Sequence, residues 1–438
     1  MESINETVVQ VTPNELTVNT FTKEFVKSLG SNIKMTDVDE ENKLELYCYV
    51  NCDNNSSADI KKCRGVVFDE VGNVVVQTFP YTPDLTSSNT EEITGLLTKP
   101  ISSYTFYEAE EGAMIRMFYY KTRWYISTHR KLDAFKSKWA SDESFGTMFK
   151  KSIEYEISVN EKLRLSLPDN EEMSLFDKFK TILDKDRQYV FIVLNTINNR
   201  IVCIPPTNPT VYHVSTFVKN IPLQFDDNEF TELNIPHPIR LTINSFEKLY
   251  DYVDNINIER TQGVMVFENG NVLCKITNPT YQEFFNVRGN EPSIKYRYLQ
   301  IRMNRKMTEM LYNLYSDKIE VFDKYENILY DIACKIFKNY KARYINKEYI
   351  TAPPDEYNVM KECHSHYMED RENNKIYIDT VIDILNKQTP TQLNKMIRQH
   401  EQEAKNLASD SEVRVSKRLI PVRGVGGAPP TTLLEESL

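Results

Sequence analysis

Short runs in which apolar and polar residues alternate fill most of the chain between residues 44 and 277. β-Branched and aromatic residues are concentrated in these runs, and Gly or Asn separates several neighbouring runs, as in β-hairpins. The predicted strands are residues 44–50, 63–68, 74–81, 114–119, 124–126, 188–194, 200–205, 211–217, 261–267 and 272–277. The pattern indicates sheets built largely from strands that are neighbours in the sequence.

Helical spacing of apolar residues appears between the strands and dominates the last third of the chain. Residues 141–149, 171–183 and 245–253 have one apolar side and are predicted to be helices. After Pro292 the strand signals stop, and helical spacing continues to about residue 407. The sequence therefore predicts an α+β fold whose C-terminal part is purely helical.

Two other segments near the N-terminal half are read from local signals. Thr12, Pro13 and Glu15 fit a capping box with proline at the first helical position, so a short helix is expected before Gly30. Residues 82–98 have no clear period and several acidic side chains, and we expect an acidic surface excursion there.

These patterns divide the chain into four parts. We expect an N-terminal segment of a helix and a strand, a sheet domain, a helical domain and a flexible Gly- and Pro-containing tail. Their expected bounds are residues 1–60, 61–290, 291–407 and 408–438.

Composition supports folded, water-exposed domains. Hydrophobic residues make up 40% of the 438 residues, mean hydropathy is −0.50, and the chain has no long uncharged apolar run, so no membrane span is expected. The N-terminus lacks the pattern of a secretory signal, which favours the cytoplasm, the nucleus or a virus particle assembled there.

The net charge of −10 disfavours nonspecific wrapping of nucleic acid but leaves a local basic groove open. Two concentrations of positive charge are candidates, and a solvated face is the plainer reading of each. They are Lys121, Arg123, Arg130, Lys131, Lys136 and Lys138, and Lys295, Arg297, Arg302, Arg305 and Lys306.

The cysteines favour a reducing environment and no metal site. The chain has seven, without repeated CxxC spacing, so reduced thiols are expected. The segment Cys363-His364-Ser365-His366 is the one local cluster of metal-ligand types, and no second cluster lies at ligand spacing. We therefore expect no metal.

A series of short motifs lies in a fixed order on the predicted strands. They are Arg64-Gly65, Phe79-Pro80, Glu108-Ala109-Glu110-Glu111-Gly112, Ser127-Thr128-His129-Arg130, Asn199-Arg200-Ile201-Val202, Gln262-Gly263 and Lys275-Ile276-Thr277. In this order, and with these apolar flanks, the region from about residue 61 to 275 resembles the covalent nucleotidyltransferase superfamily, most closely the phage-type RNA ligases. It also resembles poorly characterised proteins of large cytoplasmic DNA viruses. The resemblance implies an antiparallel-sheet nucleotidyltransferase domain, here followed by an α-helical C-terminal domain.

Four positions depart from the ligase pattern. Ala109 stands where the nucleophilic lysine would be, and in an alignment without gaps Leu194 stands in place of a glutamate. Gln262 replaces a second glutamate, and Thr277 replaces one of two lysines. Because self-adenylylation needs an amine nucleophile and charged groups around the phosphates, we expect no catalytic residue in this chain.

Other lysines are weighed as substitutes for the missing nucleophile. Lys131-Leu132-Asp133 superficially fits the lysine motif, and Lys121 and Lys99 lie nearby in the sequence. Using Lys131 would require the sheet to rearrange, and the start of a basic helix is the plainer interpretation of that segment.

The retained residues define the expected site. The resemblance implies that they bind nucleotide or RNA phosphate, and they are Arg64, Glu111, Gly112, Thr128, Arg130, Arg200 and Lys275. No cofactor is expected, and residual binding of ATP or a divalent metal is left open.

Three functions are compared. The preferred one is a noncatalytic RNA- or nucleotide-binding factor of a large DNA virus, with RNA or nucleotide and other viral proteins as partners, in the host cytoplasm or the virion. The alternative is a structural virion or assembly protein that reuses the ligase fold. An active ATP-dependent RNA ligase with an unrecognised lysine is the third.

Overall fold

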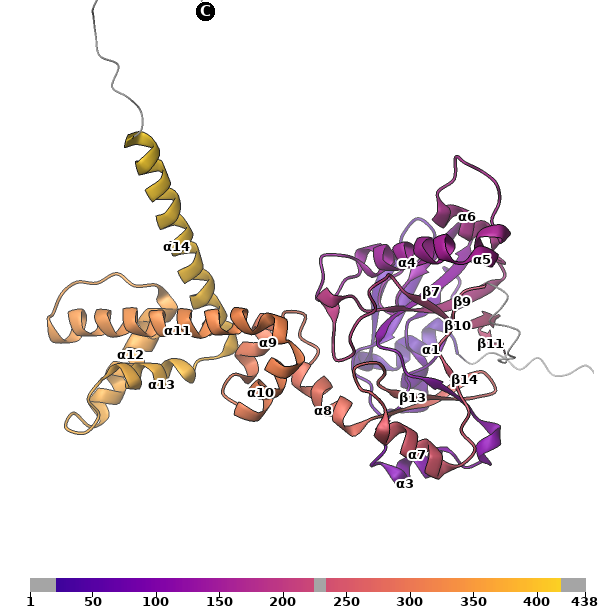
Figure 1. Ribbon diagram of the computed structural model, residues 1–438, viewed down its shortest axis with the longest axis horizontal. Helices are drawn as coiled ribbons and strands as arrows, with labels where there is room; N and C mark the ends of the chain where they lie inside the picture. Colours follow the sequence, from indigo (N-terminus) through magenta and orange to yellow (C-terminus); the bar gives the residue numbers. More distant parts are fainter. Residues whose placement is uncertain (1–20, 224–233, 419–438) are drawn as a thin grey trace, which may run out of the picture. The chain divides into compact units, whose positions relative to one another are not determined.

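The computed structural model describes residues 21–223 and 234–418, with side chains as far as residue 406. The chain forms two compact units, Met1–Ser293 and Ile294–Leu438. The first unit holds every described strand, and the second is helical (Figure 1).

A four-stranded antiparallel sheet forms the N-terminal part of the first unit. Its strand order is β1-β2-β3-β4, with the bounds Ile33–Asp39, Leu44–Tyr49, Val66–Phe68 and Val74–Val76. Helix α1 (Lys23–Ser28) packs Val26 against one face of this sheet, beside Phe68. The other face contacts the hairpin of the next sheet through Leu46, Phe118 and Tyr125.

Two five-stranded sheets form the rest of the first unit. One has the order β11-β10-β9-β7-β8, and the other has the order β12-β6-β13-β14-β5. The strands of the former are Ile221–Pro222, Val211–Val218, Arg187–Leu194, Gly112–Tyr120 and Arg123–Ser127. Those of the latter are Arg240–Leu241, Thr105–Glu108, Gly263–Glu268, Asn271–Thr277 and Asp84–Thr86.

The two sheets pack face to face and are covered by helices on their outer faces. Phe79, Tyr107, Val190, Phe217 and Phe267 form the apolar layer between the sheets. Helices α4 (Phe145–Val159), α5 (Glu161–Ser166) and α6 (Leu175–Ile182) lie over the first sheet, and α3 (Thr90–Leu96) and α7 (Phe246–Asn255) over the second (Figure 1). Helix α2 (Ala58–Lys62) precedes β3, and α8 (Pro279–Arg288) follows β14.

The helices of the second unit surround one long helix. Helix α11 (Ile319–Tyr340) packs on α9, α12, α13 and α14 and buries Phe322, Leu329, Ile332 and Ile336. The bounds of the other helices are α9 Ile294–Ile301, α10 Arg305–Leu314, α12 Pro354–Glu369, α13 Ile378–Asn386 and α14 Pro390–Arg418. Helix α14 thus continues into residues that the sequence analysis assigned to the tail.

The predicted fold class is confirmed: antiparallel sheets and helices are followed by a helical C-terminal region. Two local predictions are wrong. Residues 82–98 contain β5 and α3, with Leu85, Ile93 and Leu97 buried, so they belong to the core rather than to a surface excursion. Residues 200–205 form no strand, because a short 3-10 turn at Ile197–Asn199 redirects the chain after β9.

Strand β1 has no counterpart among the predicted elements. The capping box at residues 12–15 lies outside the described residues. Within the described residues, the first helix begins after Thr22. The Thr22 hydroxyl accepts a hydrogen bond from the backbone N–H of Phe25 and caps that helix.

Candidate functional site

A cavity of about 100 Å³ lies between the two five-stranded sheets. Its wall is mainly apolar and includes Phe79, Tyr107, Met114, Ile192, Met265 and Phe267. Polar side chains reach the cavity at Glu108, Glu110 and Lys275. An apolar cleft with a few converging polar groups is the usual form of a small-ligand site.

Ala109 lies on the cavity wall and is 1% exposed. Its backbone N–H donates to the carbonyl oxygen of Gly263 at 2.9 Å, and its own carbonyl accepts from the N–H of Gln262 at 3.0 Å. The Thr261 hydroxyl also donates to that carbonyl, at 2.9 Å. These bonds hold position 109 against β13, and the methyl group presents no nucleophile to the cavity.

Lys275, Gln262 and Thr277 meet beside the cavity in one polar network. The ammonium group of Lys275 donates to Gln262 Oε1 at 2.8 Å and pairs with Asp84 Oδ2 at 2.7 Å. The Thr277 hydroxyl donates to Asp84 Oδ1 at 2.6 Å, and Gln262 Nε2 donates to the carbonyl of Glu110 at 2.6 Å. The structure therefore brings together Ala109, Gln262, Lys275 and Thr277, as their motif order predicts.

Asp84 changes what Lys275 can do. Its carboxylate neutralises the Lys275 ammonium group, so this lysine is not a free cation for a phosphate. Asp84 is brought here by β5, which pairs in parallel with β14 so that Asp84 lies opposite Lys275. Nothing in the sequence pattern around residue 84 signals this role, because the strand is short and isolated between loops.

Two carboxyl groups on the cavity side of β6 were also missed by sequence reasoning. Glu108 accepts the Tyr252 hydroxyl at 2.7 Å and lies 3.5 Å from an Arg260 nitrogen. Glu110 forms no hydrogen bond or ion pair through its carboxyl group with the described residues. Burial, and next the nearby charge of Glu108, raises the pKa of Glu110 to about 7, against a weaker opposing effect of Arg260. The one available signal was the presence of three glutamates among residues 108–111, within an otherwise apolar stretch.

Glu111 faces away from this network and holds a loop in place. Its carboxylate accepts backbone N–H groups of Ile201 at 2.9 Å, Val202 at 2.9 Å and Cys203 at 3.1 Å, together with the Tyr281 hydroxyl at 2.8 Å. The side chain is 6% exposed. Glu111 thus accepts the backbone N–H groups that a neighbouring strand would have paired with, had residues 200–205 formed a strand.

Gly112 and Leu194 are direct partners in the pairing of β7 with β9. A Cβ on Gly112 would lie 2.3 Å from the carbonyl oxygen of Val193, so the strands approach too closely for any side chain. Leu194 lines a separate depression with Pro205 and Thr207. Phe191 and Ile192 are the β9 residues that line the cavity with Ala109.

Arg200 lies in the loop after β9, and its side chain bonds to the backbone of that loop. Its guanidinium group donates to the Val202 carbonyl through Nε at 3.2 Å and through a terminal nitrogen at 3.0 Å. The structure therefore groups Glu111, Gly112, Leu194 and Arg200 around the loop after β9, apart from the Lys275 network.

A second, basic group forms between the N-terminal sheet and the β7–β8 hairpin. Arg116 is 1% exposed, donates to the carbonyls of Gly65 and Thr128, and keeps a buried Nε without a partner. Arg64 donates to the Pro80 carbonyl at 3.2 Å and also keeps a buried, unpartnered Nε. Arg130 is exposed on the same side. No carboxylate in the described ranges forms an ion pair with these three arginines.

His129 lies within the basic group. Burial, and then the charges of Arg64, Arg116 and Arg130, lower the pKa of His129 to about 3, so the imidazole stays neutral. Burial also lowers the pKa of Arg116, to about 10, with the charge of Arg64 adding to the effect. Sequence reasoning missed Arg116, although an arginine inside the apolar run MIRMFYY is itself a signal.

Thr128 and Gly65 shape the basic group. The Thr128 hydroxyl accepts the backbone N–H groups of Arg130 at 3.3 Å and Lys131 at 3.1 Å, which makes it a turn residue. Gly65 has φ +70°, and a Cβ there would lie 2.7 Å from the Cα of His129. Arg64, Thr128 and Arg130 are therefore brought together, as a separate group from Lys275.

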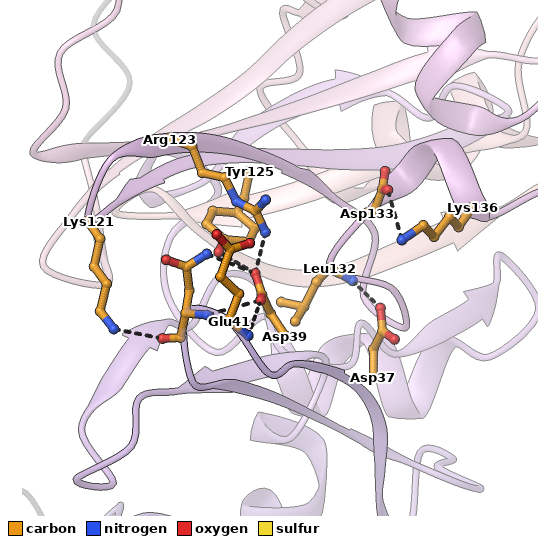
Figure 2. A network of polar contacts seen from close by, with 10 residues as sticks. Asp37, Asp39, Glu41, Lys121, Arg123, Tyr125, Leu132, Asp133 and Lys136 are labelled. Atoms are coloured by element: carbon orange, nitrogen blue, oxygen red, sulfur yellow. Dashed lines mark hydrogen bonds and ion pairs between the residues drawn. The ribbon is translucent and has the colours of Figure 1, made fainter.

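The lysines weighed as substitute nucleophiles are engaged elsewhere. Lys131 pairs with Asp37 at 3.4 Å, and Leu132 N–H donates to the same carboxylate at 2.8 Å. Figure 2 shows the hydrogen bond from Leu132 to Asp37. It also shows the Lys121 ammonium group, which donates to the Asn42 carbonyl at 3.0 Å. Lys99 pairs with Glu268. None of the three lysines lines the cavity beside Ala109.

The described residues contain neither a cluster of metal ligands nor a membrane-spanning helix. No group of His, Cys, Asp and Glu in the described ranges is arranged to hold a metal ion. All seven cysteines are free thiols. Within residues 21–223 and 234–418, no helix has the length and apolar character needed to cross a bilayer.

The fold and site define an α+β protein with a cavity between two largely antiparallel sheets and a helical second unit. The chain is 32% identical over 340 residues to an immediate-early protein ICP-46 homolog of Invertebrate iridescent virus 6, covering 75% of this chain and 72% of that protein. It therefore belongs to the family of immediate-early protein ICP-46 homologs. It is also 27% identical over 207 residues to immediate-early protein ICP-46 of frog virus 3, covering 44% and 49% of the two chains. No protein-family model matches the chain.

Solved structures similar to this chain include ATP-dependent ligases. A putative ATP-dependent DNA ligase from Aquifex aeolicus has a TM-score of 0.39 and 16% identity, covering 69% of this chain and 79% of the ligase. An archaeal ATP-dependent RNA ligase has a TM-score of 0.39 and 12% identity, covering 70% and 78%.

Proposed function

We propose that this protein is a noncatalytic RNA-binding factor that keeps nucleotidyltransferase-like sheets but performs no covalent nucleotidyl transfer. The observation that carries the proposal is the group of Arg64, Arg116 and Arg130, which no carboxylate of the described residues neutralises. A buried guanidinium group without an anionic partner carries a large desolvation penalty, and a phosphate would offset part of it. This favours a phosphate ligand beside the N-terminal sheet.

Aromatic side chains next to Arg64 support a single-stranded ligand. Tyr49 and Tyr81 contact each other edge to face, with ring centroids 6.1 Å apart, and both are half-buried. Arg64 lies close enough to lower the pKa of both hydroxyl groups, although burial dominates and raises it. Rings beside arginines are the usual elements of single-strand binding surfaces, because bases stack on the rings while cations contact phosphates.

The absence of a covalent step rests on Ala109 and on the positions of the nearby lysines. Ala109 has no nucleophilic atom, and Lys275 is paired with Asp84. The proposal therefore places phosphate binding at Arg64 and Arg130 and leaves Lys275 a structural role in the network beside the cavity.

Labelled ATP or GTP with Mg²⁺ or Mn²⁺ is expected to leave no acid-stable adduct on the protein. The physical reason is that no unpaired amine faces the cavity at position 109. The measurement is radiolabel retained after acid precipitation and electrophoresis. A stoichiometric adduct that disappears in Lys131→Ala, Lys121→Ala or Lys99→Ala would overturn the noncatalytic proposal.

Replacing Arg64 and Arg130 together by alanine is expected to weaken binding of a short single-stranded RNA by about tenfold or more. Two lost phosphate contacts should also reduce the slope of log affinity against log salt by about 1.4. Fluorescence anisotropy across a salt series measures both quantities. Arg164→Ala, which removes an exposed arginine from the same unit, is the matched control and should bind like the wild type.

A change in stability is the confounding effect in that experiment. Arg130 is exposed and Arg64 is half-buried with one bond to a carbonyl, so the melting temperature should change little. Unchanged affinity and salt dependence in a folded double variant would contradict the proposal and favour an assembly role.

A further inference from the structure

Helix α11 ends in a π-helical turn, Lys341–Ile345, in the second unit. The backbone N–H of Asn346 donates to the Lys341 carbonyl at 2.9 Å, and that of Glu348 donates to the Ala342 carbonyl at 2.9 Å. Lys347 then adopts a left-handed conformation with φ 62°. π-Helical turns are rare and are frequently found at functional sites.

The turn carries a local excess of positive charge. Residues 338–349 carry four basic side chains, Lys338, Lys341, Arg343 and Lys347, against one acidic side chain, Glu348. None of the four is ion-paired with a carboxylate within the part of the chain that the structure describes. Lys338, Lys341 and Lys347 are exposed. In a chain with a net charge of −10, such an unneutralised group is a binding signal rather than part of a balanced surface.

Aromatic rings are interleaved with these cations. Tyr344 stacks on His364 of α12 with centroids 3.9 Å apart and an angle of 13° between the rings, and His364 is 6.1 Å from Tyr367 at 28°. The Arg343 guanidinium group lies over two rings, 5.7 Å from Tyr344 and 5.2 Å from Tyr357. The row of nearly parallel rings is a surface on which further flat groups can stack.

The outer side of the turn is exposed although it is apolar. Tyr349 has an exposed fraction of 92%, the highest among the large apolar side chains of the described residues, and Ile345 has 64%. Tyr340, by contrast, is buried and anchors the turn to the helical core. Packing between α11 and α12 therefore accounts for the inner rings but leaves Tyr349 without a role.

We propose that residues 341–349, with the facing rings of α12, form a second binding surface for single-stranded nucleic acid. In this surface Lys341, Arg343 and Lys347 contact phosphates, and Tyr349 stacks on a base. The surface is separate from the arginine group of the first unit and does not depend on it. An acidic protein segment would use the cations equally well but would gain little from an exposed, stackable tyrosine.

Removing two cations tests the electrostatic part of the surface. Lys341→Ala with Lys347→Ala is expected to reduce the affinity of the full chain for a fluorescein-labelled single-stranded oligoribonucleotide about tenfold at low salt. The salt slope should fall by about 1.4. Arg305→Ala, an exposed arginine of α10 paired with Glu309, is the charge control and should leave both values unchanged.

Replacing one aromatic ring tests stacking. Tyr349→Ala is expected to lower affinity about fivefold or more with no change in the salt slope, because the lost contact is a base stack. Tyr330→Ala removes another exposed tyrosine, from α11 itself, and should have no effect. Equal affinity of Tyr349→Ala and wild type, with polyglutamate competing as well as RNA, would replace the nucleic-acid proposal by an acidic protein partner.

Both sets of variants are then combined with Arg64→Ala and Arg130→Ala. If the surface on the second unit binds RNA, its variants weaken the binding that remains in that background. If only the first unit binds, the Lys341, Lys347 and Tyr349 variants change nothing in either background, and this inference fails while the proposed function stands. If the Lys341, Lys347 and Tyr349 variants weaken binding but Arg64→Ala and Arg130→Ala do not, the site on the first unit is rejected and the surface on the second unit stands.

Discussion

Glu111→Ala is expected to lower the free energy of unfolding by about 3–5 kcal/mol, the range found when one partner of a buried charged network is removed. The substitution leaves three backbone N–H groups, of Ile201, Val202 and Cys203, and the Tyr281 hydroxyl without their acceptor. Urea denaturation monitored by tryptophan fluorescence measures the loss.

The carboxylate itself, rather than side-chain volume, is the cause in this account. Glu111→Gln keeps the size but offers one acceptor oxygen, so it should fall between the wild type and the alanine variant. If Glu111→Ala unfolds at the same urea concentration as the wild type, the loop after β9 is held by other contacts. RNA binding by folded Glu111→Gln should match the wild type, because Glu111 lies apart from the arginine group.

Glu110→Gln is expected to raise the free energy of unfolding, in contrast to Glu111→Ala. Above neutral pH the increase should be roughly 1–3 kcal/mol. The folded-state pKa of Glu110 is raised from 4.5 to about 7, first by burial and second by Glu108. A raised carboxyl pKa means that the wild type is relatively most stable below pH 4.5 and loses this contribution as pH rises to about 7. The glutamine variant has no such loss.

Unfolding free energies at pH 5 and pH 8 give the comparison. The two proteins should be close in stability at pH 5, and the glutamine variant should be the more stable one at pH 8. Glu91→Gln, at an exposed glutamate of α3, serves as the control and should show no such difference. A difference that is the same at both pH values would show that ionisation of Glu110 is not its source.

The fold was predictable where local patterns agree with the final structure. The hairpins β3–β4, β7–β8 and β13–β14 have turns at Gly72, Lys121 and Gly270 that the strand alternation already brackets. Strand β5 was not predictable, because three residues form it and its stability comes from pairing with β14, 191 residues later. Only Ile33 of the seven β1 residues is buried, so burial imposes no strong apolar pattern on the strand.

The candidate site was predictable only in part, because the residues expected in one phosphate-binding site lie in three separate groups in the structure. Ala109, Gln262 and Lys275 do lie together, because a backbone hydrogen bond joins residues 109 and 262 and the strand that follows Gln262 pairs with the strand that carries Lys275. The neutralisation of Lys275 depends on Asp84, and the role of Glu111 depends on a loop that was predicted to be a strand. Both are long-range contacts that no local sequence signal reports.

The parallel pairing of β5 with β14 also sets an order for folding during synthesis. The sheet that carries Asp84 and Lys275 takes strands from residue 84 to residue 277, so it cannot close until nearly the whole first unit has left the ribosome. Until then β5 and β6 have unpaired edges, which are sites for aggregation or for chaperone binding. The Asp84–Lys275 ion pair therefore forms late in synthesis, after residue 275 has emerged.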